Sequence, residues 1–338
     1  MLEIKEHDMD SLYVRILSDI QSDGFIVDSD TDKFSIGSNF GQKNRGTREI
    51  IGYKFVLSNP RSRLLYNTAR QFNPFFALGQ FIWNLKGSDE LNMISFYNGK
   101  GINFSDDGKT IQGSCYGKRL FKTPSGLSQI NSILSRLKED PTSRRTFAPI
   151  FQPFDNISMT KDVPCPIGVQ YFLRSDKLYA ITYMRSNSAA LVLPYNVFFF
   201  TMLQELLAKE LNAELGDYIH ICSSLHYYSD EESLVDDILA DEMPKGKPMN
   251  PMPNCTSIEY LNNLVMFEQE LRHSVNSRIK VDYWVDRSKE FDPYWAQIAY
   301  LLICHALQQS GQVDEVSEVA ELLNTEYKYF LKRLVIKH

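Results

Sequence analysis

The sequence predicts an α/β fold of the α+β type, followed by a helical C-terminal region. Strand-like and helical segments alternate over about the first 250 residues, whereas the segments after a proline-rich stretch are all helical. The chain has 338 residues, of which 43% are apolar and 12% aromatic, and this supply of core residues excludes a chain that is disordered throughout. We therefore expect one large α/β unit with an appendage.

The first half of the chain is expected to begin with a helix. Residues 8–20 carry apolar side chains at helical spacing, and residues 49–58 read as a strand. Residues 74–85 are too apolar for a surface helix, so we expect this segment to be buried. Residues 127–137 have one apolar face, which predicts an amphipathic helix.

The middle of the chain is strand-like around one long helix. Residues 146–152, 168–174 and 178–184 are predicted strands, and residues 217–225 return to strand-like sequence. Residues 197–211 form a helix that is apolar on most faces. Such a helix should be central and covered on both sides.

A segment rich in proline divides the chain. Residues 242–254 contain four prolines and no periodicity, which favours a linker or an extended arm. The sequence beyond it predicts helices at residues 261–275, 293–309 and 313–334. We therefore expect an α/β domain at residues 1–254 and a helical region at residues 255–338.

Charge and cysteine usage exclude several classes of protein. Lys plus Arg is 36 and Asp plus Glu is 42, so the net charge of −6 argues against a protein that binds nucleic acid polymers. The five cysteines are scattered without a C-x-x-C pair, which argues against a disulfide scaffold and a structural zinc site. The six histidines lack ligand spacing, so we expect no metal. No signal peptide or membrane span is recognisable, and we expect a cytoplasmic protein without membrane contact.

Four short motifs occur in order along the chain. They are Ser143-Arg144-Arg145, then Pro164-Cys165, then Arg185-Ser186 with Pro194-Tyr195-Asn196, and finally His226-x-Tyr228. Their order and spacing resemble the superfamily of thymidylate synthases and pyrimidine nucleotide hydroxymethylases, over roughly residues 45–229. The resemblance implies a mixed sheet packed with helices within residues 1–254. It also implies methylation or hydroxymethylation of carbon 5 of a uracil nucleotide monophosphate by a homodimer.

The chemistry of this reaction requires a nucleophile. Carbon 5 of uracil is a poor nucleophile until a thiolate adds to carbon 6, and Cys165 is the candidate thiol. A guanidinium nearby lowers the pKa of a thiol, and the resemblance places Arg185 there. It also places Tyr116 beside the cysteine and Gln80 at the position of a catalytic glutamate.

The resemblance assigns the remaining site residues to parts of the nucleotide. Phosphate would be bound by arginine forks together with Ser186, and the arginine pair would reach into the partner's pocket. These arginines are Arg45, Arg144, Arg145 and Arg185. Gln170 would line the base pocket, and His226 and Tyr228 would hold the sugar. Asn196 favours uracil, because an amide offers one donor and one acceptor where cytosine would suit a carboxylate better.

Several positions depart from the pattern of the superfamily. Gln80 cannot accept a proton as glutamate does, and Pro166 replaces the usual histidine after the cysteine. Ser188 and Val192 stand where the superfamily has the aspartate and the glycine that accommodate its co-substrate, 5,10-methylenetetrahydrofolate. Methyl and hydroxymethyl products therefore both stay open, as does a changed electrophile. The alternative is a non-catalytic or regulatory nucleotide-binding homologue.

Overall fold

The computed structural model of the chain describes residues 2–27, 46–122, 126–242 and 246–334. In these residues a seven-stranded mixed sheet has the order β1-β3-β7-β6-β5-β4, and β2 pairs with β3. β1 runs parallel to β3 and β6 parallel to β7, whereas the other pairs are antiparallel. The strands are β1 (Leu2–Glu6), β2 (Phe25–Val27), β3 (Thr47–Leu57), β4 (Phe147–Pro149), β5 (Pro166–Arg174), β6 (Lys177–Ser188) and β7 (Glu214–Tyr228). The predicted α/β class is confirmed.

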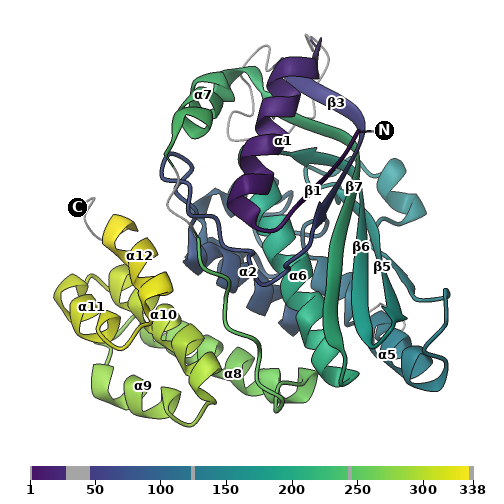
Figure 1. The fold of residues 1–338 in the computed structure, drawn as a ribbon. Coiled ribbons are helices and arrows are strands. Elements are labelled where there is room, and N and C mark those ends of the chain that lie inside the picture. Colours follow the sequence, from purple (N-terminus) through teal and green to yellow (C-terminus); the bar gives the residue numbers. More distant parts are fainter. Residues whose placement is uncertain (1, 28–45, 123–125, 243–245, 335–338) are drawn as a thin grey trace.

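Three helices lie on one side of this sheet (Figure 1). They are α1 (Met9–Asp23), α2 (Pro74–Lys86) and α6 (Leu193–Glu210). The long helix α6 is buried from Leu193 to Ala208, as its nearly uniform apolar sequence predicts. The shorter helices of this part of the chain are α3 (Leu91–Tyr97), α4 (Tyr116–Leu120), α5 (Gln129–Glu139) and α7 (Glu232–Ala240).

Local sequence signals set the ends of α2. The Asn73 side chain accepts a hydrogen bond from the backbone N–H of Phe76, and Pro74 occupies the first turn. The helix ends at Gly87, whose φ of 62° is the left-handed conformation that favours glycine. α2 packs against α4 and α6. The ends of α2 therefore help to determine where these three helices, which carry residues of the site, meet.

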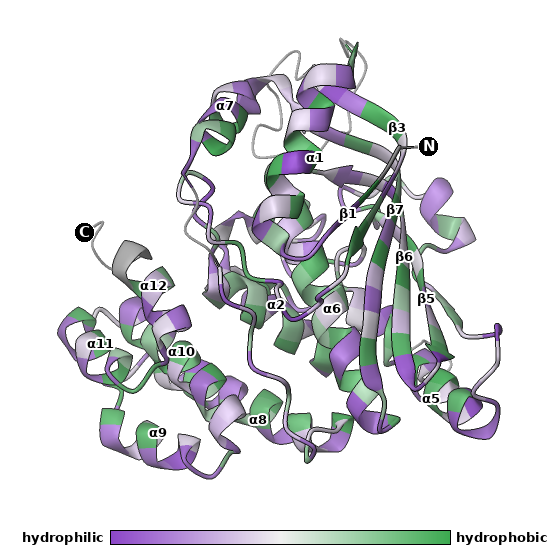
Figure 2. Ribbon diagram, viewed as in Figure 1, coloured by the Kyte–Doolittle hydropathy of each residue, from purple (hydrophilic) through white to green (hydrophobic). Residues whose placement is uncertain are grey.

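The C-terminal region consists of α8 (Ile258–Ser274), α9 (Val281–Ser288), α10 (Pro293–Gln309), α11 (Val313–Ala320) and α12 (Thr325–Leu334). α8 and α10 pack on α2, and the outer helices α9 and α11 alternate hydrophilic and hydrophobic residues (Figure 2). The prediction of one helix over residues 313–334 is wrong. Gln297 of α10 donates to the Leu322 carbonyl and accepts from the Asn324 N–H, and these bonds replace helical ones at the break.

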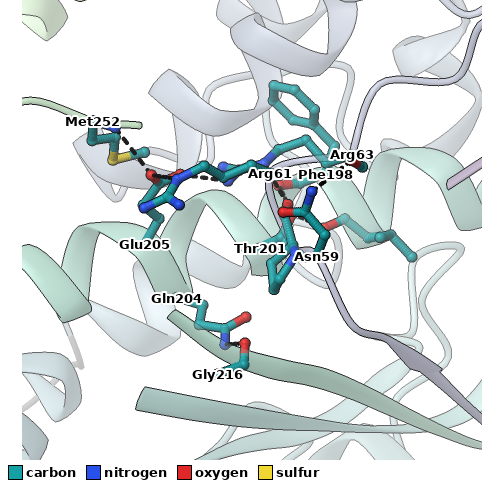
Figure 3. A network of polar contacts seen from close by, with 12 residues as sticks. Asn59, Arg61, Arg63, Phe198, Thr201, Gln204, Glu205, Gly216 and Met252 are labelled. Atoms are coloured by element: carbon teal, nitrogen blue, oxygen red, sulfur yellow. Dashed lines mark hydrogen bonds and ion pairs between the residues drawn. The ribbon is translucent and has the colours of Figure 1, made fainter. Parts of the chain in front are cut away.

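Residues 246–254 of the proline-rich segment form a packed arm. Met249 and Met252 are buried, and the Met249 N–H donates to the Arg61 carbonyl at 2.9 Å. The Met252 N–H donates to Glu205 of α6 at 3.0 Å, and Glu205 also accepts from Arg61 and Arg63 (Figure 3). Burial would raise the pKa of Glu205, but the two guanidinium groups hold it below its ordinary value. The arm is thereby attached to the core helix.

The face of the sheet opposite α6 presents apolar side chains that are only half-buried. Ile181 and Tyr183 of β6 lie beside Ile219 and Ile221 of β7 on this face. Ile51 of β3, which pairs with Ser224, has 67% of its surface exposed. Within the described residues, no helix is long and apolar enough to cross a membrane.

Candidate active site

Cys165 lies directly before β5. The start of β5 pairs with the end of β6, so Cys165 lies beside the end of β6. The Arg185 N–H donates to the Cys165 carbonyl at 2.9 Å, so the two residues are neighbours across the strands. The Arg185 guanidinium donates to the carbonyls of Pro164 and Val163 at 2.9 and 3.0 Å, and its Nη2 lies 4.0 Å from Cys165 Sγ. One side chain therefore holds the cysteine loop and places a positive charge beside the thiol.

Two charged groups act on the thiol in opposite directions. Burial raises the pKa of the Cys165 thiol above its ordinary value, Arg185 lowers it, and Asp162 raises it. Because a thiolate is a stronger nucleophile than a thiol, Arg185 is the group that would favour a reaction at Cys165.

Asp162 anchors the loop that carries the cysteine. Its carboxylate accepts from the N–H groups of Gly113 and Ser114 at 2.7 and 2.6 Å and from the Ser114 hydroxyl at 2.6 Å. These bonds hold residues 162–165 against the segment that leads into α4. Asp162 is not among the residues that the sequence predicts for the site, although it lies only three positions before Cys165.

The next turn of the same segment places Tyr116. The Gly117 N–H donates to Asn84 Oδ1 of α2 at 2.6 Å. A Cβ atom at position 117 would lie 1.8 Å from the Asn84 carbonyl oxygen, so only glycine permits this approach. Tyr116 is thus fixed between α2 and the start of α6.

Tyr116 connects the cysteine to Asn196. Its hydroxyl donates to Asn196 Oδ1 at 3.4 Å, and both side chains are buried. Burial raises the pKa of Tyr116 well above its ordinary value, and the nearby Cys165 adds to this effect. Tyr116 is therefore a neutral donor at physiological pH. Asn196 Nδ2 donates in turn to Asn187 Oδ1 at 3.2 Å, and no sequence motif predicts this contact.

The ends of β6 and β7 meet next to this group. Ser186 lies opposite Ser224, and Ser188 lies opposite His226. The rings of His226 and Tyr228 contact each other edge-on, with centroids 5.3 Å apart. Because β6 and β7 are parallel and β6 leads directly into α6, these side chains collect at one edge of the sheet.

The structure does not bring the arginine pair to the cysteine of its own chain. Arg144 and Arg145 are exposed and precede β4, whose Phe147 lies opposite Gln170 of β5. Roughly five residues of extended strand, or roughly 17 Å, separate Cys165 from Gln170. The two arginines lie beyond that point, because β4 and β5 are antiparallel.

Gln170 is likewise placed away from the cysteine. Its amide donates to the Arg144 carbonyl at 3.0 Å and accepts from the Tyr183 hydroxyl at 3.5 Å, on the face of the sheet opposite α6. Within the described chain Gln170 thus contacts Arg144 and Tyr183, and its part in a base pocket stays a prediction. Arg45 lies outside the described residues.

Comparison with known proteins identifies the family. The family model described as thymidylate synthase matches residues 12–270. The chain belongs to the thymidylate synthase family. The structure agrees with this: a thermostable thymidylate synthase A from Bacillus subtilis superimposes with a TM-score of 0.58 at 23% identity, covering 75% of this chain and 93% of that one.

Individual relatives of the thymidylate synthase family match different lengths of the chain. A deoxyuridylate hydroxymethyltransferase of Bacillus phage SP01 is 29% identical over 80% of this chain and 73% of its own length. A second one, from Delftia phage PhiW-14, is 30% identical over 61% of each chain. A thymidylate synthase of Bacillus mojavensis is 32% identical over 44% of this chain and 54% of its own length.

The residues at which this chain departs from the thymidylate synthase pattern lie on α2, at the end of β6 and at the start of α6. Gln80 lies on α2 with only 8% of its surface exposed, and its Oε1 has no hydrogen-bond partner among the described residues. Ser188 Oγ is buried and also lacks a partner in this part of the chain. Val192, at the start of α6, is 44% exposed. Two unused polar atoms and an accessible apolar side chain are compatible with a ligand beside Asn196.

The loop between β6 and α6 is held firmly in place. Arg70 donates to the carbonyls of Ala190 and Leu191 at 2.7 and 2.5 Å, and the Tyr13 hydroxyl donates to the Ala190 carbonyl at 2.5 Å. Ser188 and Val192 flank this loop. Their positions are therefore set by the N-terminal helix and by the segment before α2. Among the described residues, no three His, Cys, Asp or Glu side chains gather as metal ligands would.

Proposed function

We propose that this chain transfers a one-carbon unit to carbon 5 of deoxyuridylate through a temporary bond between Cys165 and carbon 6. The observation that carries the proposal is the approach of Arg185 to the thiol at 4.0 Å, together with the Tyr116–Asn196 pair next to it. Nucleophilic catalysis on a uracil ring requires a thiol with a positive charge that opposes the rise of its pKa, and an amide that pairs with the base.

The chain's own residues account for the covalent steps. The Cys165 thiolate adds to carbon 6, and the electron pair of the double bond moves to carbon 5 and oxygen 4. Carbon 5 then attacks the one-carbon unit and loses its proton to solvent, and the amine that carried the unit departs. Water, or hydride in the case of methylation, adds to the unit, and the sulfur leaves as the ring double bond re-forms. Arg185 stabilises the thiolate in both the first and the last step, and Asn196 pairs with oxygen 4 and the N3–H.

A hydroxymethyl product is the version that the observations favour. The phage hydroxymethyltransferase match covers 80% of this chain and the thymidylate synthase match 44%. Gln80, Ser188 and Val192 also change the side of the site where the co-substrate would lie. When bound, 5,10-methylenetetrahydrofolate supplies the one-carbon unit, and Ser188 and Val192 would contact it. Hydroxymethylation then ends with water, whereas methylation requires hydride.

The phosphate would be bound by residues of two chains. Arg185 and Ser186 lie near Cys165, whereas Arg144 and Arg145 lie on the far part of the sheet and are exposed. The half-buried apolar face around Ile181 and Ile219 offers a surface for a second copy. We infer a homodimer in which each chain contributes its arginine pair to the partner's nucleotide, with Gln170 supporting Arg144.

The sugar and the division of the chain complete the proposal. His226 and Tyr228 would hold the 3′-hydroxyl of the deoxyribose, because they adjoin Ser188 at the same edge of the sheet. Residues 1–254 would form the catalytic domain, with the proline-rich arm attached to α6. The helical residues 255–338 would support α2. All five cysteines are free, which favours a reducing cytoplasm.

The decisive experiment is mass spectrometry of the protein mixed with 5-fluorodeoxyuridylate and methylenetetrahydrofolate. We expect a covalent complex that is lost in Cys165→Ser and kept in the matched control Cys255→Ser, since Cys255 is exposed and distant from the site motifs. Product analysis then distinguishes 5-hydroxymethyl-deoxyuridylate from thymidylate. A complex that persists in Cys165→Ser would refute the proposal.

The alternative of a non-catalytic nucleotide-binding homologue is not favoured, because the relatives named above are transferases. It makes a separate prediction, namely deoxyuridylate binding without release of tritium from carbon 5. Release that depends on Cys165 would exclude it.

A further inference from the structure

A chain of buried hydrogen bonds extends from Asn196 away from the candidate site. Asn196 Nδ2 donates to Asn187 Oδ1 at 3.2 Å, and Asn187 Nδ2 lies 3.2 Å from His220 Nε2. His220 Nδ1 lies 2.9 Å from the Tyr218 hydroxyl. None of the three side chains beyond Asn196 has more than 1% of its surface exposed. The site motifs do not explain this chain of contacts.

The direction of each bond in this chain follows from the orientation of the Asn187 amide. Burial lowers the pKa of His220 to about 3, so the ring is neutral and carries one N–H. The Asn187 amide nitrogen can only donate, so His220 Nε2 must accept. The proton therefore sits on Nδ1 and is donated to the Tyr218 oxygen. Phe55 stacks on the imidazole at 4.6 Å and holds the plane of the ring.

The same order fixes the amide of Asn196. Its Oδ1 faces the Tyr116 hydroxyl, and its Nδ2 faces Asn187 Oδ1. If the amide turned over, two carbonyl oxygens would face each other in a buried place. Such a pair is unfavourable unless Asn187 also turns and the His220 proton moves from Nδ1 to Nε2.

We propose that Asn187 and His220 are specificity-determining positioning residues, which fix the orientation of the Asn196 amide and thereby the choice of uracil over cytosine. In the fixed orientation, one N–H and one lone pair of Asn196 remain for the base. Uracil and cytosine present opposite patterns at positions 3 and 4, so a turned amide would exchange the preference. This inference rests on the proposed function, because it concerns the same nucleotide site.

The test measures the ratio of the dissociation constants of deoxycytidylate and deoxyuridylate by calorimetry. Asn187→Leu removes the acceptor of the Asn196 amide, and His220→Leu removes the acceptor of the Asn187 amide. We expect the ratio to fall about tenfold in each variant. Asn187→Asp still accepts from Asn196 and should retain the ratio. If the role were merely structural, the variants would weaken the binding of both nucleotides equally. An unchanged ratio in Asn187→Leu would overturn the inference.

A milder pair of variants covers the case in which the leucine variants do not fold. Tyr218→Phe removes the acceptor of the His220 proton and should lower the ratio. Tyr171→Phe is the matched control, because Tyr171 is equally buried and its hydroxyl has no hydrogen-bond partner among the described residues. Equal ratios in the two variants would count against the inference.

The chain of bonds can also be examined without nucleotide. In protein labelled with ¹⁵N-histidine, the signals missing from His220→Gln identify the ring, and we expect a neutral Nδ1–H tautomer at pH 7. A charged ring or the Nε2–H tautomer would overturn the inference. Absence of binding of both nucleotides to the unmodified protein would instead refute the proposed function and, with it, the specificity role.

Discussion

Nη2 of Arg185 lies 4.0 Å from Sγ of Cys165, and the same guanidinium donates to the carbonyls of Val163 and Pro164. The residue that lowers the pKa of the thiol therefore also shapes the loop that presents it. Asp162 does the reverse, since it anchors the loop and raises the thiol pKa. The pKa of the Cys165 thiol is therefore set by its burial and by a balance between the opposite charges of these two groups.

This balance predicts opposite shifts for two variants. Arg185→Gln should move the pH at which half of Cys165 is alkylated by iodoacetamide upward by about one unit, because the positive charge is lost. Asp162→Asn should move it downward, because a negative charge is lost. Both are measured in a Cys255→Ser background with mass-spectrometric readout. Arg174→Gln, at the opposite end of β5, is the control and should cause no shift.

Base choice should follow the side chain at position 196. Asn196→Asp replaces the donor with an acceptor, so we expect deoxyuridylate to bind at least about tenfold more weakly and deoxycytidylate to bind more tightly. Calorimetry with both nucleotides checks this. Equal losses for the two nucleotides would indicate that Asn196 supports the fold of the site without contacting the base.

The shared site predicts complementation between inactive variants. Cys165→Ser and Arg145→Ala should each lose activity, but a mixture that re-assorts its subunits should recover about a quarter of the unmodified activity. Half of the dimers are then mixed, and each mixed dimer has one site with both an intact Cys165 and an intact Arg145 from the partner chain. Activity is measured after mild denaturation and refolding of the mixture. Recovery that fails while mixed dimers form would refute the shared site.

A carboxyl group at position 80 should introduce a new ionisation. Gln80 is 8% exposed, so burial will raise the pKa of the side chain in Gln80→Glu. We expect the pH profile of tritium release from carbon 5 to gain a step between about pH 5 and 8. Gln80→Met should lack this step. A profile identical in all three proteins would indicate that position 80 does not face the reacting atoms.

Acid should destabilise the fold through two buried histidines. Burial lowers the pKa of His220 to about 3 and that of His305 to about 4, below the unfolded value of about 6.5. The unfolded chain binds more protons, so this stability is present above about pH 6.5 and is lost as pH falls. Each histidine contributes a slope of up to about 1.4 kcal/mol per pH unit.

Urea unfolding at pH 7, 6 and 5 checks this slope. His305→Gln should reduce it, because Gln does not take up a proton in this range. The exposed His273→Gln is the control and should leave the slope unchanged. A slope that His305→Gln does not alter would contradict the prediction.

Much of the fold follows from local patterns in the sequence. The central helix α6 and the buried helix α2 are apolar on most faces, and such helices can only be stable when other elements cover them. Strand and helix ends are less certain. β6 extends to Ser188 because its pairing with β7 continues through polar residues, and β7 extends to Tyr228 because it pairs with β3 up to that residue.

The break between α11 and α12 shows what periodicity cannot predict. The apolar stripe over residues 313–334 continues through the break, and the interruption depends on Gln297 of a different helix. The same holds for the proline-rich arm. Its composition predicts an extended segment, but its attachment to Glu205 depends on three elements meeting in space.

The sequence by itself determined the α/β class, and it predicts a reactive thiol at Cys165, its arginine partner and a base-reading amide at Asn196, because these rest on residue chemistry and spacing along the chain. Tertiary structure alone decided the rest. It separated Arg144 from Cys165, moved Gln170 to the opposite face, and brought Asn187 and His220 together behind Asn196. The physical reason is that strand pairing and the two faces of the sheet set distances between residues, and spacing along a chain does not.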